Sequence, residues 1–148
     1  MRSKKLLLAI TAAAAAAGVV AGVGSADATP RSGALHVTKE CSQYDGQAGS
    51  FCTITSSNIP QIKPGMRVVY FQAFGQNGLN SDLVLSRGHG STALGHVVLN
   101  ATTSRITFSG GTGAFAGFHA DAVVSVVSVD GADVWHWDGT YSFTSEDD

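Results

Sequence analysis

The sequence predicts an all-β protein, a closed eight-stranded antiparallel β-barrel that follows an N-terminal leader. Runs of strand length, rich in β-branched and aromatic residues, alternate with clusters of Gly, Asn, Asp and Pro from residue 33 onward. No stretch after the leader keeps a helical period for ten residues. Eight short strands without helices form a sandwich or a barrel, and we favour the barrel because closure leaves no exposed edge.

The strands are separated by recognisable turn signals. Pro64-Gly65, "GQNGLN", "RGHGS" and "DGAD" each interrupt a run of alternating residues. The expected strands are 34–40, 51–58, 66–74, 82–86, 93–100, 104–109, 118–129 and 134–143. A closed barrel of this size has either a packed interior or room for one small ligand.

The first 28 residues have the three parts of a secretory signal peptide. A basic start is followed by an Ala-rich apolar run, residues 6–23, and then by Ala26-Asp27-Ala28, which resembles a cleavage site. The alternative is a permanent membrane anchor, since the run is nearly long enough to span a bilayer. We favour cleavage, which predicts a secreted chain, residues 29–148, forming a single barrel domain without a stable membrane anchor.

The charge balance argues against nucleic acid as a partner. Beyond residue 28 the chain keeps six of its nine Lys/Arg and ten of its eleven Asp/Glu, so its net charge is −4. A surface that binds phosphate groups needs clustered positive charge.

Two cysteines, Cys41 and Cys52, are expected to form a disulfide. An exported chain enters an oxidising compartment, where paired cysteines become oxidised. The alternatives are a redox pair or a metal pair, but ten intervening residues fit neither a CxxC motif nor close zinc spacing. The histidines show no metal-binding spacing either, so we expect no metal and no cofactor.

A glycine-rich stretch, residues 111–116, fits the G-x-G-x-x-(G/A) pattern of dinucleotide-binding loops. That motif requires a following helix, whose N-terminus holds the pyrophosphate. Here a β-branched, alternating run follows instead. We therefore predict a tight turn between two strands, with Gly117 allowing a bulge or a sharp bend.

The same hairpin, "ITFSGGTGAFAGFHADAVVSV", resembles the signature of the allene oxide cyclase and dirigent protein superfamily, here as a bacterial secreted member. In that family a strand runs into G-G-(T/S)-G-x-(F/Y)-x-(G/A) and then into a long strand of small residues. The matching positions here are Gly110, Gly111, Thr112, Gly113, Phe115 and Gly117.

The resemblance implies an eight-stranded antiparallel barrel that is often a homo-oligomer and holds a hydrophobic small molecule. Plant members cyclise an epoxide fatty acid or direct the coupling of phenoxy radicals, and bacterial relatives include cyclases that act on polyketides. The resemblance offers Glu40 as a stand-in for the carboxylate of the cyclase, but the alignment in this region is too loose to carry the role over. The catalytic residues therefore remain unassigned.

Aromatic side chains on two expected strands are the candidate ligand-binding residues. Trp135, Trp137 and Tyr141 share one face of the last strand, and Tyr70 and Phe74 share one face of the third. They either fill the core or form the wall of an apolar pocket. On the opposite face of the last strand, His136 and Asp138 either pair for proton transfer or lie in solvent.

Two classes of function follow. We predict a secreted barrel that binds a small apolar ligand without catalysis; the alternative is a cyclase or isomerase acting on a lipid-like or polyketide-like substrate in the lumen. The size and contents of the barrel lumen distinguish these two functions from a purely structural role. A continuous cavity of about 300 Å³ or more with a buried acid or histidine favours binding or catalysis, whereas a filled core favours a structural or partner-binding role.

Overall fold

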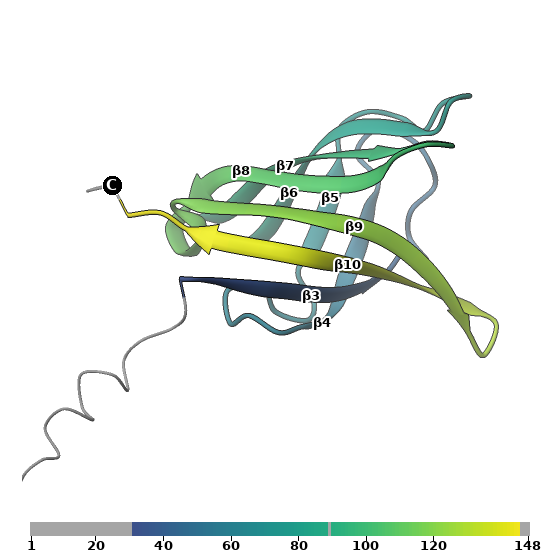
Figure 1. The fold of residues 1–148 in the computed structure, drawn as a ribbon. Helices are drawn as coiled ribbons and strands as arrows, with labels where there is room; N and C mark the ends of the chain where they lie inside the picture. Colours follow the sequence, from purple (N-terminus) through teal and green to yellow (C-terminus); the bar gives the residue numbers. More distant parts are fainter. Residues whose placement is uncertain (1–30, 89, 146–148) are drawn as a thin grey trace, which may run out of the picture. The chain divides into compact units, whose positions relative to one another are not determined.

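The computed structural model describes residues 31–88 and 90–145, and these residues form a closed antiparallel β-barrel of eight strands (Figure 1). The predicted fold class is therefore confirmed, while the predicted signal peptide lies outside the described residues. The strands are β3 (Ser32–Glu40), β4 (Phe51–Ser57), β5 (Arg67–Tyr70), β6 (Leu79–Gly88), β7 (Ser91–Leu99), β8 (Ser104–Thr112), β9 (Phe118–Val129) and β10 (Ala132–Phe143).

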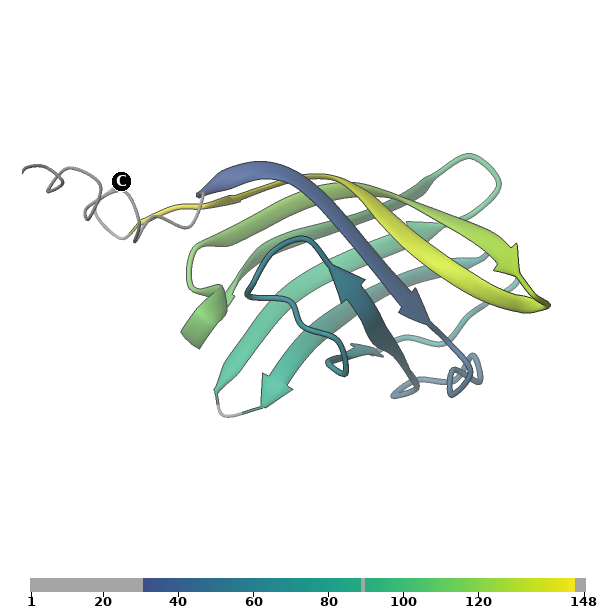
Figure 2. The ribbon, with the colours of Figure 1, turned by 90° about the horizontal axis from the view of Figure 1, so that it is seen from below.

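Each strand pairs with its neighbour in the sequence, and the last strand returns to the first. The order around the barrel is β10-β3-β4-β5-β6-β7-β8-β9. Eight residue pairs, from Trp135 opposite Lys39 to Ser142 opposite Ser32, join β10 to β3, which lie side by side in Figure 2. Closure therefore brings the two ends of the domain together and gives every strand a partner on both sides.

Seven of the expected strands agree with the structure to within a few residues, and the third is shorter than predicted. The alternation in 66–74 predicts a long strand, but β5 ends at Tyr70. The buried hydroxyl of Ser81 accepts hydrogen bonds from the backbone N–H groups of Phe71 and Gln72. The Phe71 N–H also bonds the carbonyl oxygen of Asp82 on β6, but the Gln72 N–H is held by the Ser81 side chain instead of by a strand partner. The chain then leaves the sheet, and Phe74 lies in a loop.

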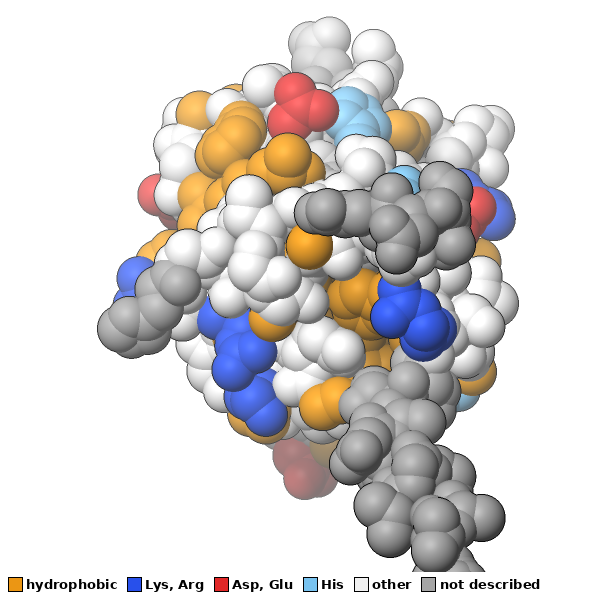
Figure 3. Space-filling model, turned by 90° about the vertical axis from the view of Figure 1, so that its left-hand side faces the viewer, with side chains coloured by type: hydrophobic (Ala, Val, Ile, Leu, Met, Phe, Trp, Pro, Cys, Tyr) orange, Lys and Arg blue, Asp and Glu red, His pale blue; other side chains and the backbone are white. Residues whose placement is uncertain are grey.

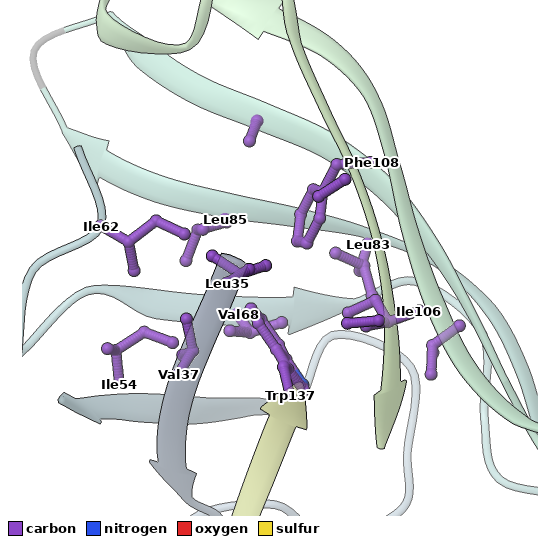
Figure 4. Packing of buried hydrophobic residues seen from close by; sticks show 14 of the residues in the cluster. Leu35, Val37, Ile54, Ile62, Val68, Leu83, Leu85, Ile106, Phe108 and Trp137 are labelled. Carbon is purple, nitrogen blue, oxygen red and sulfur yellow. The ribbon is translucent and has the colours of Figure 1, made fainter. Parts of the chain in front are cut away.

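The barrel interior is filled by side chains that alternate along the strands. In β3 the buried residues Leu35 and Val37 are separated by exposed His36, as period two requires. Figure 4 shows the central packing of Leu35, Val37, Ile54, Ile62, Val68, Leu83, Leu85, Ile106, Phe108 and Trp137. Most of the lumen is consequently a hydrophobic core rather than a channel.

The glycine-rich stretch is a strand end followed by a short turn, as expected for a barrel rather than a nucleotide loop. Strand β8 continues to Thr112, and a single 3-10 turn, η1 (Gly113–Phe115), leads to β9. The Phe115 side chain is fully buried. Gly117 has φ of 75°, and a Cβ there would lie 2.0 Å from the carbonyl oxygen of Thr144. Glycine is needed at this position because two backbone segments meet there.

Cys41 and Cys52 form the predicted disulfide, with their Cα atoms 4.3 Å apart. The bond joins the residue that follows β3 to the second residue of β4, and it closes a loop that contains Tyr44. A disulfide is compatible with an extracellular location.

Replacing both cysteines by alanine is expected to lower the free energy of unfolding by about 3 kcal/mol, because an open loop gives the unfolded chain more conformational entropy. Urea denaturation of the oxidised protein and of the double variant measures the difference. Wild-type protein unfolded with a reducing agent is the control and should resemble the variant. Equal urea midpoints for the oxidised wild type, the reduced wild type and the double variant would contradict a stabilising role of the disulfide.

The outer surface carries polar, charged and apolar side chains, and four of the exposed large apolar residues lie on β9: Val123, Val126, Val127 and Val129. On the face shown in Figure 3, hydrophobic, acidic, basic and uncharged side chains are interspersed, and the basic ones form small separate groups. Cross-strand pairs such as Arg105–Asp121, at 2.6 Å, lie exposed on the barrel wall. In the parts of the chain described, no helix has the length and hydropathy needed to cross a bilayer.

Candidate functional site

Lys39 is a charged residue type on the inner face of the barrel. It continues the alternation of Leu35 and Val37 along β3, and only 4% of its surface is exposed. Closure of the barrel places it opposite Trp135 of β10. A lysine almost never lies this deep unless it is paired, so its surroundings need an explanation.

Within the described residues, the Lys39 amine has one strong hydrogen-bonding partner. Nζ donates to Tyr70 Oη at 2.7 Å and lies 3.6 and 3.7 Å from the sulfur atoms of Cys41 and Cys52. No carboxylate among residues 31–88 and 90–145 forms an ion pair with it. Burial without a counter-charge therefore lowers the pKa of Lys39 to about 7, which makes the neutral amine available near neutral pH.

Aromatic rings surround the amine. Nζ lies 5.3 Å from the ring centroids of Tyr70 and Trp135 and 5.8 Å from that of Trp137. These distances are within the range of cation–π attraction, which favours the protonated form and partly offsets its desolvation. Burial, together with the neighbouring Tyr44, raises the pKa of Tyr70 above its ordinary value, so Tyr70 is a neutral phenol.

A small cavity of about 80 Å³ lies beside the amine, and we call it the mouth pocket. It is lined by Lys39, Cys41, Tyr44, Cys52, Tyr70, Phe74, Leu79, Leu99 and Trp135. The hydroxyl of Tyr44 is buried and has no hydrogen-bonding partner among the described residues. The walls are thus mainly apolar, with an amine and two phenol groups as the polar contacts.

The mouth pocket meets the surface beside a wider groove. Phe74, which lines it, is 53% exposed. The groove has a volume of about 700 Å³ and shares Phe74, Leu99 and Trp135 with the mouth pocket. The two spaces therefore adjoin at these three side chains.

Three of the five predicted ligand residues line the mouth pocket: Tyr70, Phe74 and Trp135. Trp137 is 1% exposed and packs in the core, where its ring centroid is 5.6 Å from that of Phe108. Tyr141 lies six residues beyond Trp135 along β10 and packs near Phe143, with ring centroids 5.9 Å apart. Trp135, Trp137 and Tyr141 share one face of β10, but they do not meet at one site. The strand runs along the barrel and therefore places them at different depths.

The enclosed space is smaller than the 300 Å³ expected of a lumen site, and its buried titratable group is a lysine rather than an acid or a histidine. The large side chains of the core occupy the rest of the lumen. By the criterion stated above, this filled core favours a structural or partner-binding role over a ligand inside the lumen. A ligand has room at this end of the barrel only, with most of its length outside the enclosed space.

The other residues considered for chemistry lie on the outer wall. Asp138 binds His36 of the neighbouring strand, with Oδ1 and Nδ1 2.8 Å apart, and both side chains are more than half exposed. His136, which the sequence offered as the partner of Asp138, takes no part in this contact. Glu40 accepts a hydrogen bond from the backbone N–H of Ser42 and does not line the mouth pocket. These groups form a solvated polar surface.

Lys39 was missed by reasoning from residue types, although the pattern that reveals it is present in the sequence. In "ALHVTKE" the apolar positions 35 and 37 predict that position 39 also faces inward. A lysine at an inward position within three residues of the end of a predicted strand is therefore a signal for a buried amine at the end of a barrel.

A buried amine with a lowered pKa can act in two ways. As a base it can accept a proton from a bound molecule, and as a nucleophile it can attack a carbonyl carbon. Tyr70, 2.7 Å away, can donate or return a proton in either case.

Comparison with known proteins gave no match: no family model, no curated protein and no solved structure matches this chain. The function is therefore argued from the site itself.

Proposed function

We propose that the protein binds a small apolar ligand at the mouth pocket, as a secreted barrel. The observation that carries the proposal is an apolar cavity with a buried amine at its wall that pairs with no carboxylate of the described residues. Ligand sites combine apolar walls with a few polar groups that fix orientation. Lys39 and the unpartnered hydroxyl of Tyr44 are suitable polar groups.

The shape of the site restricts the ligand. A cavity of about 80 Å³ admits only a narrow group, since a cavity of about 150 Å³ is what holds a benzene molecule. The adjoining groove runs past Phe74, Leu99 and Trp135, which offer apolar contacts. A straight-chain molecule with a small polar head fits both parts.

Two features of the sequence support the same proposal. The leader-like residues 1–28 and the Cys41–Cys52 disulfide are in keeping with export. The hairpin that contains Gly110–Gly117 resembles the allene oxide cyclase and dirigent superfamily, whose barrels hold hydrophobic small molecules. Membership of that superfamily, and a homo-oligomeric state, are part of the proposal.

A cyclase or isomerase acting on a lipid-like or polyketide-like substrate is the second candidate. The hydrogen-bonded pair of Lys39 and Tyr70 favours it, because an amine with a pKa of about 7 beside a phenol can move a proton. Recovery of a bound compound after incubation distinguishes the two: a binding protein returns it unchanged, whereas an isomerase returns a product of equal mass and different retention.

Hexan-1-ol is a suitable probe because its hydroxyl and alkyl chain match the pocket and the groove. Titration is expected to shift the amide NMR signals of residues around Lys39, Tyr44 and Trp135 in a saturable way. Filling the rim of the pocket by Leu99→Trp should weaken binding at least about tenfold, because the bulky ring occupies the ligand's volume.

The matched control is Leu94→Trp on the same strand, where the leucine is 51% exposed and does not line the pocket. This variant should bind hexan-1-ol as the wild type does. Equal weakening by both substitutions, or an absence of saturable shifts in the wild type, would overturn the proposed function.

A further inference from the structure

We propose that Lys39 captures the carbonyl group of an aldehyde or ketone ligand as a reversible imine in the mouth pocket. This inference rests on the proposed function, which it deepens by naming the class of ligand. The geometry supplies an amine at the wall of a small cavity, a phenol beside it and an adjoining groove to which Phe74, Leu99 and Trp135 offer apolar contacts.

The position of the amine suits attack on a carbonyl carbon. Lys39 Nζ lines the cavity and has Tyr70 Oη as its one close polar partner, at 2.7 Å, with the two sulfur atoms at 3.6 and 3.7 Å. No carboxylate among the described residues holds it by an ion pair, so the nitrogen is not committed to a salt bridge. The nitrogen lone pair is also available at neutral pH, because burial lowers the pKa of Lys39 to about 7.

The reaction balances with groups that the site holds. The Nζ lone pair forms a C–N bond to the carbonyl carbon while the C=O π pair moves to oxygen, and the phenol of Tyr70 donates a proton to that oxygen. The resulting carbinolamine loses a proton from nitrogen, which returns to Tyr70. Tyr70 then donates its proton a second time, to the carbinolamine hydroxyl, which leaves as water while the nitrogen lone pair forms the C=N bond. The protonated imine returns its N–H proton to the Tyr70 phenolate, which restores the phenol. One carbonyl compound and one amine thus give one imine and one water.

The surroundings favour the imine over its hydrolysis. The cavity has about 80 Å³ of space, and the walls around Nζ are aromatic rings and a disulfide. Once the head of a ligand occupies this space, few water molecules can reach the C=N bond. The unpartnered hydroxyl of Tyr44 is placed among the same wall residues and offers a hydrogen bond to the carbonyl oxygen before the reaction.

Other amines in the chain provide an internal comparison. The sequence contains four lysines, of which Lys39 and Lys63 lie in the described residues. Lys63 is exposed and does not line the mouth pocket. A general reaction of aldehydes with protein amines labels exposed lysines, whereas capture at the pocket labels Lys39 selectively.

The test is reductive trapping of hexanal by cyanoborohydride at pH 7 on the purified full chain, followed by peptide mapping. Hydride transfer converts an imine to a stable secondary amine that carries one hexyl group. We expect labelling of Lys39 to exceed that of Lys63 at least about tenfold, because an amine with a pKa of about 7 is about half unprotonated at this pH, whereas an ordinary lysine is almost wholly protonated. An excess of hexan-1-ol should protect Lys39 by competition.

A control in urea and a variant that lacks the proton donor complete the test. The same reaction in concentrated urea should label Lys39 and Lys63 equally, because unfolding removes the pocket. Tyr70→Phe keeps the ring and removes the hydroxyl, and it should slow trapping at Lys39 while circular dichroism stays unchanged.

The outcomes separate the two proposals. Saturable binding of hexan-1-ol without selective labelling of Lys39 overturns imine capture and leaves the binding function in place. An absence of hexan-1-ol binding overturns the binding function, and with it this inference. Selective labelling that hexan-1-ol prevents and urea abolishes supports both.

Discussion

Raising the pH from 7 to 10 is expected to increase the free energy of unfolding by about 3–4 kcal/mol through Lys39 alone. Burial lowers the pKa of Lys39 to about 7 in the folded protein, whereas a lysine in an unfolded chain keeps its ordinary value of roughly 10.4. Between these values the unfolded state binds more protons than the folded state, so stability rises with pH. Tyr70 acts in the opposite direction above about pH 10, because its pKa is raised on folding.

Urea denaturation at pH 7, 8.5 and 10 measures the slope of the free energy of unfolding against pH. Lys39→Met, which replaces the amine by an unbranched apolar chain, should remove most of the pH dependence. Lys63→Met is the matched control, and its slope should equal that of the wild type because Lys63 is exposed. A slope that survives in Lys39→Met would show that the buried amine is not its source.

Trp137→Ala is expected to lower the free energy of unfolding by about 3–5 kcal/mol. The indole is 1% exposed and lies at the centre of the packed lumen, with its ring centroid 5.6 Å from that of Phe108 (Figure 4). Removing it leaves a cavity that the surrounding strands cannot close, because each is held on both sides by hydrogen bonds.

Thermal and urea denaturation at one fixed pH check this effect. Val127→Thr on β9 is the control, since Val127 is 50% exposed and threonine keeps the β-branched shape. It should change stability by less than about 0.5 kcal/mol. A comparable loss in both variants would indicate that position 137 does not lie in a packed core.

The buried amine lowers the stability of the barrel at neutral pH. An apolar side chain at position 39 would continue the pattern of Leu35 and Val37 without a desolvation cost. No described carboxylate offsets that cost. Ionisable groups whose pKa is perturbed by burial in a cavity are typical of functional sites, which is why Lys39 is the centre of both proposals.

Local pattern was enough to predict the strands, most of their limits and the turn chemistry. The "DG" pair at 130–131 turns β9 into β10, with φ of 53° and 84° at its two residues, as a two-residue hairpin requires. The error at β5 had a tertiary cause, because the side chain of Ser81 holds the backbone that follows Tyr70. Such a contact has no local sequence pattern.

The sequence by itself determined which residues share a strand face, so that position 39 lies on the face of Leu35 and Val37, and which two cysteines pair. Inward and outward positions follow from the period-two geometry of a strand, which is a property of the backbone. Only the tertiary structure decided which inward residues meet. Closure of β10 on β3 sets Trp135 opposite Lys39, the end of β5 brings Tyr70 to the amine, and the disulfide loop adds Tyr44. Register and closure depend on contacts between distant segments, so no local pattern could distinguish the wall of the mouth pocket from the core around Trp137.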